Sequence, residues 1–368
     1  MPSFSFLSPV EIVFGRGTSR AAASRVAAMG PNILLVHGAE PARAAWLRDI
    51  LQVDGCDVQT VACPSEPDLP MLDAARETLV RPYAIVALGG GAVVDFGKAL
   101  AALLPCKGPS RDYLEIVGTG RPLDAGPLPF VAVPTTAGTG SEVTKNAVIT
   151  VPDQQLKVSL RDPRMVPDLA IVDADLMQGA PRAVALPAAL DAVTQVIEPI
   201  CTPRANPMTD ALTRAAIPAA LAALRPLIED DDPEAWDTFA WVSTCGGVAL
   251  ANAGLGAVHG LAGVIGGLTG ARHGAICGRL LPPVLAANRA ALPDDPRLTW
   301  VVEQIDATFP DGLTRWIDAM GLPRLSEMGV TPGQYDRIAQ DAANASSMKA
   351  NPTILSARVL IDILAEAS

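Results

Sequence analysis

The chain has 368 residues, of which 49% are hydrophobic and 18% are charged. This composition supports large buried cores and excludes a disordered chain, and the length favours two domains over one. The formal net charge is −11, and no basic cluster occurs, so nucleic acids and anionic membranes are poor candidate partners.

The first half of the chain alternates short apolar runs with helical patterns. Strands are predicted at Asn32–His37, Asp57–Ala62, Tyr83–Leu88, Pro129–Val133 and Leu169–Val172. Helices are predicted at Ala39–Val53, Leu69–Leu79 and Ala92–Leu104. Because strands separated by helices pair in parallel, residues 1–180 are expected to form an α/β domain with helices on both faces of a mostly parallel sheet.

The second half, residues 181–368, is predicted to be all-α, because alanine-rich helical patterns follow one another with proline and glycine between them. The predicted helices are Ala188–Ile200, Thr209–Leu227, Pro233–Ala251, Leu255–Gly266, Arg279–Ala291, Thr299–Phe309, Leu313–Met320, Thr331–Ala345 and Thr353–Ala367.

The six cysteines form no CxxC pair, which indicates reduced thiols in a cytoplasmic protein. The N-terminal residues lack the basic segment and apolar core of a signal peptide. Every apolar run is broken by Gly, Pro or charge before about 18 residues, so no membrane span is expected.

Two polar or glycine-rich loops follow predicted strands. The first, LGGGAVVDFGKAL, places three glycines between a strand and a helix, where backbone N–H groups can face a phosphate. The second, VPTTAGTGSEVTKNAV, carries several hydroxyl side chains. Either loop alone could be an ordinary turn. Together, at the ends of two strands of one sheet, they indicate a nucleotide site at its carboxyl edge.

Candidate metal ligands occur in the helical half. Histidine is rare in this chain, yet His259 and His273 lie in one glycine-rich stretch, and the third histidine is His37. Asp191 and Gln195 are four residues apart, so they share one face of a helix. These four side chains could surround one divalent cation, which points towards an enzyme.

Several blocks resemble the iron-containing, or group III, alcohol dehydrogenases. They run in order along nearly the whole chain: IVFGRG, GGGAVVDFGKA, PTTAGTGSEVT, LKVSLRDPRMVPDLAIVDADL, LPAALDAVTQVIEP, NPMTDALTRAAI, NAGLGAVHGL and ARHGAICG. The resemblance implies a dehydroquinate synthase-like fold, with an N-terminal nucleotide-binding α/β domain, a C-terminal helical domain and a metal between them. It also implies at least a homodimer.

The resemblance implies roles for individual residues. Gly90, Gly91 and Asp95 would line the pyrophosphate and nicotinamide side of the cofactor. Thr135, Thr136 and Thr139 would surround its phosphates and the adenine–ribose, and Lys157 would reach a ribose hydroxyl.

The choice of nucleotide depends on the position after the strand Asn32–His37. NAD-preferring relatives have an aspartate there, and this chain has Gly38. A carboxylate would repel a 2′-phosphate, whereas glycine leaves room for one, so NADP is favoured over NAD. Arg43 could help to hold that phosphate.

The resemblance implies a metal, Fe²⁺ or Zn²⁺, held by one Asp and three His. Asp191, His259 and His273 match, and would carry catalysis through the metal. The fourth position is Gln195, a weaker amide donor. It could ligate directly or through water, or the site could be unused, as in the metal-independent maleylacetate reductase type.

A second departure is Gly263, where many relatives have a histidine that helps to relay protons. Proton transfer would then need water, a cofactor hydroxyl or the metal-coordinated substrate, and the substrate could be a functionalised alcohol. The predicted function is a metal-dependent NAD(P)-linked alcohol dehydrogenase or aldehyde reductase acting on small molecules. The alternatives are a dehydroquinate synthase-like lyase, which needs more basic residues, and a non-catalytic nucleotide-binding remnant.

Four further residues receive non-catalytic interpretations. Lys98 is expected to be structural or solvated, and Glu142 to brace its loop. His37 is assigned a surface or packing role, and Cys277 a small buried apolar role.

Overall fold

The structure is a computed structural model that describes residues 3–368. It divides into two compact units. The α/β unit comprises Leu7–Thr136 and Gly140–Gln178. The helical unit comprises Gly179–Ser368, the short segment Ala137–Thr139 and residues 3–6.

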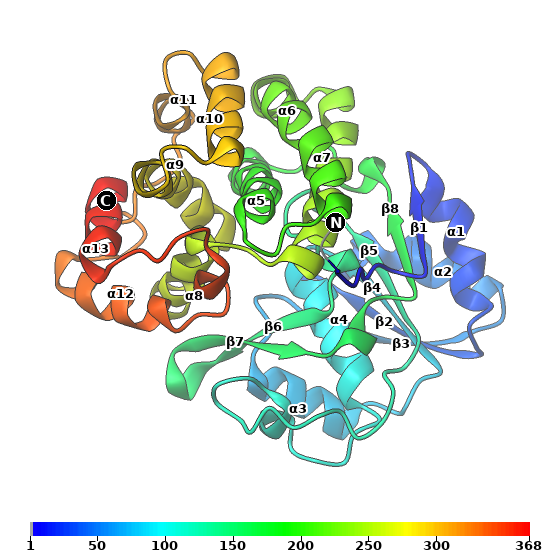
Figure 1. Cartoon of the computed structure of the whole chain (residues 1–368). Helices are drawn as coiled ribbons and strands as arrows, with labels where there is room; N and C mark the ends of the chain where they lie inside the picture. Colours follow the sequence, from blue (N-terminus) through cyan, green and yellow to red (C-terminus); the bar gives the residue numbers. More distant parts are fainter. Residues whose placement is uncertain (1–2) are drawn as a thin grey trace. The chain divides into compact units, whose positions relative to one another are not determined.

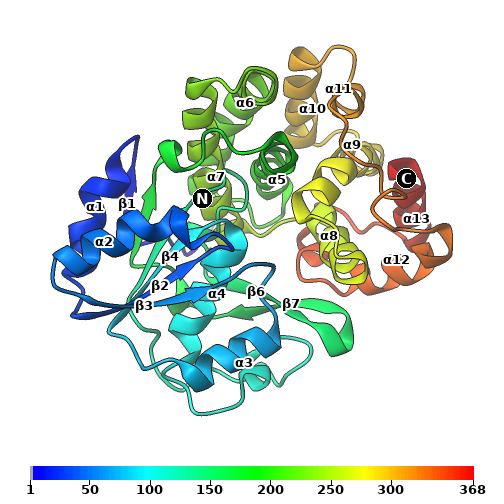
Figure 2. The same cartoon turned by 180° about the vertical axis from the view of Figure 1, so that it is seen from behind.

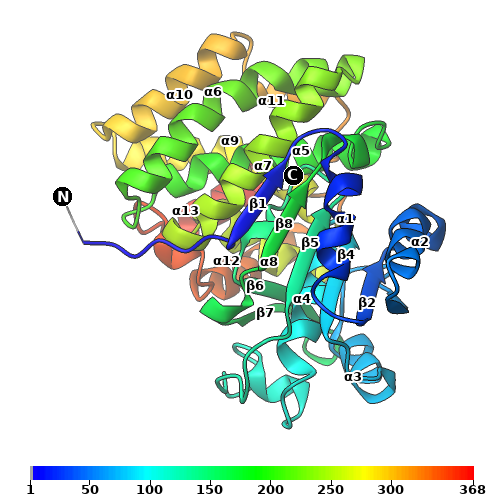
Figure 3. The ribbon, with the colours of Figure 1, turned by 90° about the vertical axis from the view of Figure 1, so that its right-hand side faces the viewer.

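The α/β unit is built on a parallel sheet with strand order β1-β8-β5-β4-β2-β3 (Figure 3). The strands are β1 (Glu11–Phe14), β2 (Asn32–His37), β3 (Asp57–Ala62), β4 (Ala84–Gly89), β5 (Phe130–Pro134) and β8 (Leu169–Val172). All five predicted strands are confirmed, two of them shifted by one residue. β1 was not predicted, because its short EIVF run leaves three of its four side chains exposed and shows no buried pattern.

Helices cover both faces of this sheet, as predicted. On one face lie α1 (Thr18–Ala27) and α2 (Ala45–Val53), and on the other lie α3 (Leu69–Thr78) and α4 (Gly91–Leu103). Alternate side chains of each central strand enter the two cores: Ile33 packs with the α1 and α2 residues, and Leu34 packs with α3 and α4. Figure 2 shows α4 alongside the sheet.

A second, antiparallel pair of strands joins the α4 face and was not predicted. β6 (Asn146–Val151) and β7 (Leu156–Arg161) form a hairpin. Buried and half-buried residues alternate along β6, which is the period of a strand with one face on a core. The sequence interpretation had assigned the preceding threonines to a loop and did not follow the strand beyond them.

The helical unit is all-α within the described residues, as predicted (Figure 1). Its helices are α5 (Arg182–Cys201), α6 (Pro207–Asp230), α7 (Pro233–Ala253), α8 (Ala257–Thr269), α9 (His273–Ala291), α10 (Pro296–Thr308), α11 (Leu313–Ala319), α12 (Tyr335–Ala343) and α13 (Ala357–Ala367). Two of them begin earlier than predicted. α5 continues through Pro187, and α9 begins six residues earlier than predicted, at His273.

Two of these helices are apolar over a length that could span a membrane, although Pro or charged residues interrupt their apolar runs as predicted. By length and composition alone, α5 and α6 could each cross a bilayer, and the sharply bent pair α7 and α8 could form a third span. The sequence analysis counted uninterrupted apolar runs, whereas these helices carry isolated polar residues. In the structure 83% of the apolar window of α5 is buried inside the protein, and 44% of that of α6.

Candidate metal centre and nucleotide-binding loops

Three helices of the helical unit bring the predicted metal ligands together. Asp191 lies in the middle of α5, His259 in the first turn of α8, and His273 is the first residue of α9. The Asp191 Oδ1 atom is 3.3 Å from His259 Nε2 and 3.9 Å from His273 Nε2. The two imidazole centroids are 5.3 Å apart. Three residues that are distant in sequence therefore converge on one small volume.

Two buried atoms in this cluster lack hydrogen-bond partners among the described residues. They are Asp191 Oδ1 and His259 Nε2, which face each other at 3.3 Å without hydrogen-bond geometry. A buried polar atom without a hydrogen bond lowers the stability of the fold by about 1–3 kcal/mol, so we expect a ligand to compensate such a pair. A divalent cation between them would satisfy both, because carboxylate and imidazole are ordinary metal ligands.

The charged groups around the cluster favour the binding of a cation. Burial alone would raise the pKa of Asp191, but the close contact with the His259 ring and the charge of His273 outweigh it, and the pKa lies below its usual value. Burial alone would lower the pKa of His259. The negative charges of Cys277 and Glu198 and the contact with Asp191 instead hold that pKa well above its usual value. The site therefore attracts either protons or a metal ion.

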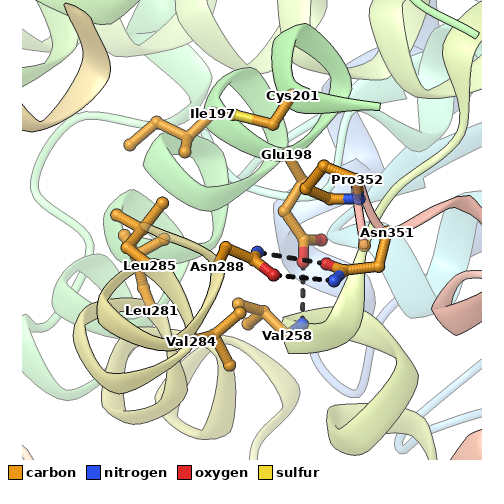
Figure 4. A pocket seen from close by; sticks show the side chains of 11 residues that line it. Ile197, Glu198, Cys201, Val258, Leu281, Val284, Leu285, Asn288, Asn351 and Pro352 are labelled. Atoms are coloured by element: carbon orange, nitrogen blue, oxygen red, sulfur yellow. Dashed lines mark hydrogen bonds between the residues drawn. The ribbon is translucent and has the colours of Figure 1, made fainter. Parts of the chain in front are cut away.

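Glu198 orients the His259 ring and was missed by the sequence interpretation. Its Oε2 atom lies 2.6 Å from His259 Nδ1, and its Oε1 accepts the backbone N–H of Val258 at 2.7 Å. Figure 4 shows the Glu198 carboxylate reaching the first turn of α8. Because a carboxylate only accepts, Nδ1 carries the proton and Nε2 offers its lone pair to the cluster. The spacing Asp191, Gln195, Glu198 on one helix face could have revealed this residue.

The backbone at Gly256 approaches Glu198 closely, which allows the Glu198 carboxylate to reach His259. A Cβ at Gly256 would lie 2.8 Å from Glu198 Oε1 and 3.0 Å from Asn351 Oδ1, so a side chain there would displace both groups. Asn351 accepts the N–H of Ala257 at 3.1 Å and exchanges two hydrogen bonds with Asn288. The N-terminus of α8, and with it His259, is thereby fixed from two sides.

Gln195 and Cys277 border the same cluster. The Nε2 of Gln195 donates to the carbonyl of Gly138 at 3.1 Å, and its buried Oε1 lacks a partner among the described residues. Gln195 as a ligand stays a prediction. Cys277 is fully buried, and its sulfur lies 3.6 Å from His273 Nε2. The donor atoms of Asp191, His259, His273 and Cys277 all lie within 4.8 Å of one another. Cys277 is buried, as expected from the sequence, and its sulfur also borders the cluster.

The predicted nucleotide loops lie at the carboxyl edge of the sheet in the α/β unit. β2 leads to β3 on one side, whereas β4 leads to β5 on the other, so the strand order reverses between β2 and β4. His37 pairs with Leu88 across this point. Gly38 follows β2 and Gly90 follows β4, so both flank the position where open α/β sheets bind ligands.

Glycine is sterically required at the end of β4. A Cβ at Gly89 would lie 2.6 Å from the Cβ of Val93, and one at Gly90 would lie 3.3 Å from a Thr136 methyl. Gly90 caps α4, which begins at Gly91, and the N–H of Thr135 donates to the Gly89 carbonyl at 2.9 Å. The two loops are thus side by side, and the α4 N-terminus provides N–H groups suited to a phosphate.

Asp95 and Lys98 brace the second loop. The Asp95 carboxylate accepts hydrogen bonds from Ser141 Oγ and, at 2.9 Å, from the N–H of Val148. The buried Lys98 ammonium donates to the Ser141 carbonyl at 2.6 Å, to Thr144 Oγ1 at 2.9 Å and to the Asn146 carbonyl at 2.9 Å. The structural alternative for Lys98 therefore describes its role, and the solvated one does not.

The other predicted contacts are distributed over the two units. Lys157 lies on β7, largely buried, with its ammonium 3.6 Å from Glu66. Thr135 and Thr136 belong to the α/β unit, and Thr139 belongs to the helical unit. His37 is buried at the end of β2, which supports its packing role, and Glu142 is buried in its loop. The cofactor contacts of these residues stay predictions.

Comparison with known proteins identifies the family. Residues 9–174 match the family described as iron-containing alcohol dehydrogenase, and residues 186–368 match the C-terminal part of the Fe-containing alcohol dehydrogenase family. The chain is 30% identical to an NAD-dependent methanol dehydrogenase from Bacillus methanolicus, covering 77% of each chain. It is 31% identical to alcohol dehydrogenase 4 of Saccharomyces cerevisiae, covering 77% of this chain and 75% of the other.

A solved structure has the same fold over its whole length. The crystal structure of a 1,3-propanediol oxidoreductase superposes with a TM-score of 0.91 at 27% identity over 100% of both chains. The predicted fold class and enzyme class are thereby confirmed. The chain belongs to the family of iron-containing alcohol dehydrogenases, which are oxidoreductases acting on CH–OH groups.

Proposed function

We propose that this chain is a metal-dependent alcohol dehydrogenase and aldehyde reductase that uses Asp191, His259 and His273 to hold its metal ion. The observation that carries this proposal is the facing pair of buried, unpartnered acceptors, Asp191 Oδ1 and His259 Nε2. A divalent cation bound between these two atoms would satisfy both of them. Family membership supplies the reaction class.

The reaction is the transfer of a hydride between an alcohol carbon and C4 of a nicotinamide, with release of a proton from the alcohol oxygen. A divalent metal ion supplies Lewis acidity towards that oxygen, and the nicotinamide accepts or donates the hydride. The charge of Asp191 offsets that of the ion, while Glu198 keeps the His259 lone pair available. The glycines at the end of β4 allow a pyrophosphate to approach the α4 N-terminus.

The His259→Ala variant tests the role of the cluster. We expect bound metal and aldehyde-dependent cofactor oxidation at 340 nm to fall together. Metal affinity should fall by more than about a hundredfold, the upper range for losing even an outer-shell partner. Elemental analysis of purified protein and steady-state kinetics measure the two quantities.

An exposed acidic residue of α10 provides the control. Glu303→Ala should leave metal content and turnover unchanged. Turnover that survives in His259→Ala while metal is lost would show that catalysis does not use the metal.

The proposed cofactor is NADP(H) in preference to NAD(H). Gly38 lies beside the switch point of the sheet, and a Cβ there would meet only a methyl of Val93, at 3.9 Å. The position therefore accepts a side chain without a clash, and its lack of a carboxylate leaves space for a 2′-phosphate. The relative from Bacillus methanolicus is NAD-dependent, so this preference would distinguish the two proteins.

Gly38→Asp should reverse this preference. Two like charges about 4 Å apart repel by about 1–4 kcal/mol, so KM for NADP(H) should rise by at least about fivefold while KM for NAD(H) falls. Gly38→Asn is the matched control, because it adds the same volume without charge. Equal loss of both cofactors in the two variants would indicate a steric effect and contradict the proposal.

The proposed substrates are small alcohols and aldehydes, with room for a substituent. Two relatives are a methanol dehydrogenase and a 1,3-propanediol oxidoreductase. In this chain Gly263 lies one turn after His259 on α8, and a Cβ there would meet no described atom within 4 Å. That open space supports a substituted substrate, and an aldehyde panel with both cofactors would rank the candidates.

A further inference from the structure

The metal cluster contains one donor atom that the proposed function does not use. Cys277 lies one turn after His273 on α9, so the two side chains share a helix face. Its side chain is fully buried, and its sulfur contacts His273 Nε2 at 3.6 Å. The sulfur is also within 4.8 Å of the donor atoms of Asp191 and His259.

Two of the spacings among these atoms match tetrahedral coordination, and a third, 3.9 Å between Asp191 Oδ1 and His273 Nε2, is longer. With metal–ligand bonds of about 2.0–2.3 Å, two nitrogen or oxygen donors lie about 3.3 Å apart, and a sulfur and a nitrogen about 3.6 Å apart. The structure has 3.3 Å between Asp191 Oδ1 and His259 Nε2, and 3.6 Å between Cys277 Sγ and His273 Nε2. Small side-chain rotations would bring all four donors onto one ion.

The competing fourth donor is the Gln195 amide. Its Nε2 is held by the carbonyl of Gly138, and its Oε1 is buried and unpartnered among the described residues but is a neutral donor. A thiolate carries a full charge and binds borderline and soft metals far more strongly than an amide does. The two unpartnered atoms, Asp191 Oδ1 and His259 Nε2, are an independent sign that a ligand occupies the point on which the sulfur also converges.

We propose that the Cys277 thiolate is a ligand of the metal centre, giving an Asp–His–His–Cys donor set. The proposal rests on the proposed function, because it concerns the same metal site. Sulfur coordination selects Zn²⁺ over harder ions, and Gln195 is then a positioning residue that ties α5 to the segment Ala137–Thr139.

Cobalt substitution of the full-length protein tests this assignment. Co²⁺ replaces Zn²⁺ in tetrahedral sites, and a thiolate ligand gives it a charge-transfer absorption in the near ultraviolet that histidine and aspartate do not give. We expect this band in the wild type and in the control Cys245→Ser, which alters a buried cysteine on α7 outside the cluster. Cys277→Ser should lose the band and bind Zn²⁺ more than about tenfold more weakly.

The outcomes separate this proposal from the proposed function. Cobalt that binds with visible d–d bands sensitive to His259→Ala, but without the charge-transfer band, overturns the thiolate ligand and leaves the metal site intact. A wild type that binds neither Co²⁺ nor Zn²⁺ overturns both.

A second measurement needs no variant and so does not depend on the folding of Cys277→Ser. X-ray absorption of the wild-type zinc protein should show one sulfur neighbour at about 2.3 Å. A first shell of nitrogen and oxygen alone overturns the proposal.

Discussion

At the residue scale, the structure explains how one imidazole is kept ready for a metal. Glu198 is the acceptor for His259 Nδ1, and therefore the lone pair of Nε2 faces Asp191. The orientation depends on a carboxylate that accepts on both oxygens, since Oε1 is occupied by the N–H of Val258. Such outer partners set both the tautomer and the direction of a ligand.

Glu198→Gln should therefore weaken metal binding without removing a ligand. The amide NH₂ would face Nδ1, which would then act as acceptor, and the proton would move to Nε2, where it blocks coordination. We expect a loss of about ten- to hundredfold in metal affinity, measured by titration with Zn²⁺.

The same substitution on the surface is the control for this prediction. Glu303→Gln, on the exposed face of α10, should bind Zn²⁺ as the wild type does. An unchanged affinity in Glu198→Gln would mean that the ring is oriented by packing alone.

At the element scale, α4 supports both nucleotide loops. Its N-terminus follows the glycines of β4, and its buried face carries Asp95 and Lys98, which hold the loop that runs into β6. The Lys98 ammonium is 3.8 Å from the Asp95 carboxylate. Removing one member of a buried pair leaves the other uncompensated and costs about 3–5 kcal/mol. Lys98 is thus part of the scaffold of the loop.

Lys98 also predicts a pH dependence of stability. Burial, opposed by the charges of Asp95 and Glu142, lowers the pKa of Lys98 to about 8. In the unfolded chain lysine keeps its proton up to about pH 10.4, so between these values the unfolded state binds more protons. The Lys98 contribution therefore raises the free energy of unfolding as the pH increases from about 8 to about 10.

Chemical denaturation at pH 8 and pH 10 measures this effect. Lys98→Met should lower stability at both values and flatten the rise relative to the wild type. Lys107→Met, at an exposed lysine, should retain the wild-type slope. A wild-type slope in Lys98→Met would show that another group is responsible.

At the scale of the whole molecule, the chain folds as two compact units with separate ligand chemistry. The unpartnered atoms of the metal cluster, Asp191 Oδ1 and His259 Nε2, lie in the helical unit, and the glycine turns for the nucleotide lie in the α/β unit. Ligands stabilise the state that binds them by about 2.7 kcal/mol at one hundred times Kd. Because two units need not unfold together, each ligand can act on its own transition.

Calorimetry should show separate effects of the metal and the nucleotide on the unfolding transitions of the two units. Removing metal with a chelator should lower the transition of the helical unit, whereas NADP⁺ added to the chelated protein should raise that of the α/β unit. A chelator without effect on either transition would contradict a structural contribution of the metal.

Much of the fold followed from local pattern. Continuous apolar runs such as Asn32–His37 specify strands buried on both faces, and the alanine-rich periods after residue 181 specify helices. The predicted elements differ from the structure where the local signal is weak or conflicting. β1 is short and largely exposed, and β6 follows a threonine-rich loop. The first turns of α9, before the predicted start, contain Gly274 and Gly278, and glycine disfavours a helix.

The sequence by itself determined the elements, the family and the residue types able to bind a metal and a nucleotide, because periodicity and motifs are properties of neighbouring residues. Only the tertiary structure decided which side chains meet. Glu198 and Cys277 became part of the cluster because α5, α8 and α9 pack together, and no spacing within one segment encodes a distance between helices. The unpartnered atoms of Asp191 and His259 likewise exist only once burial has removed water from them.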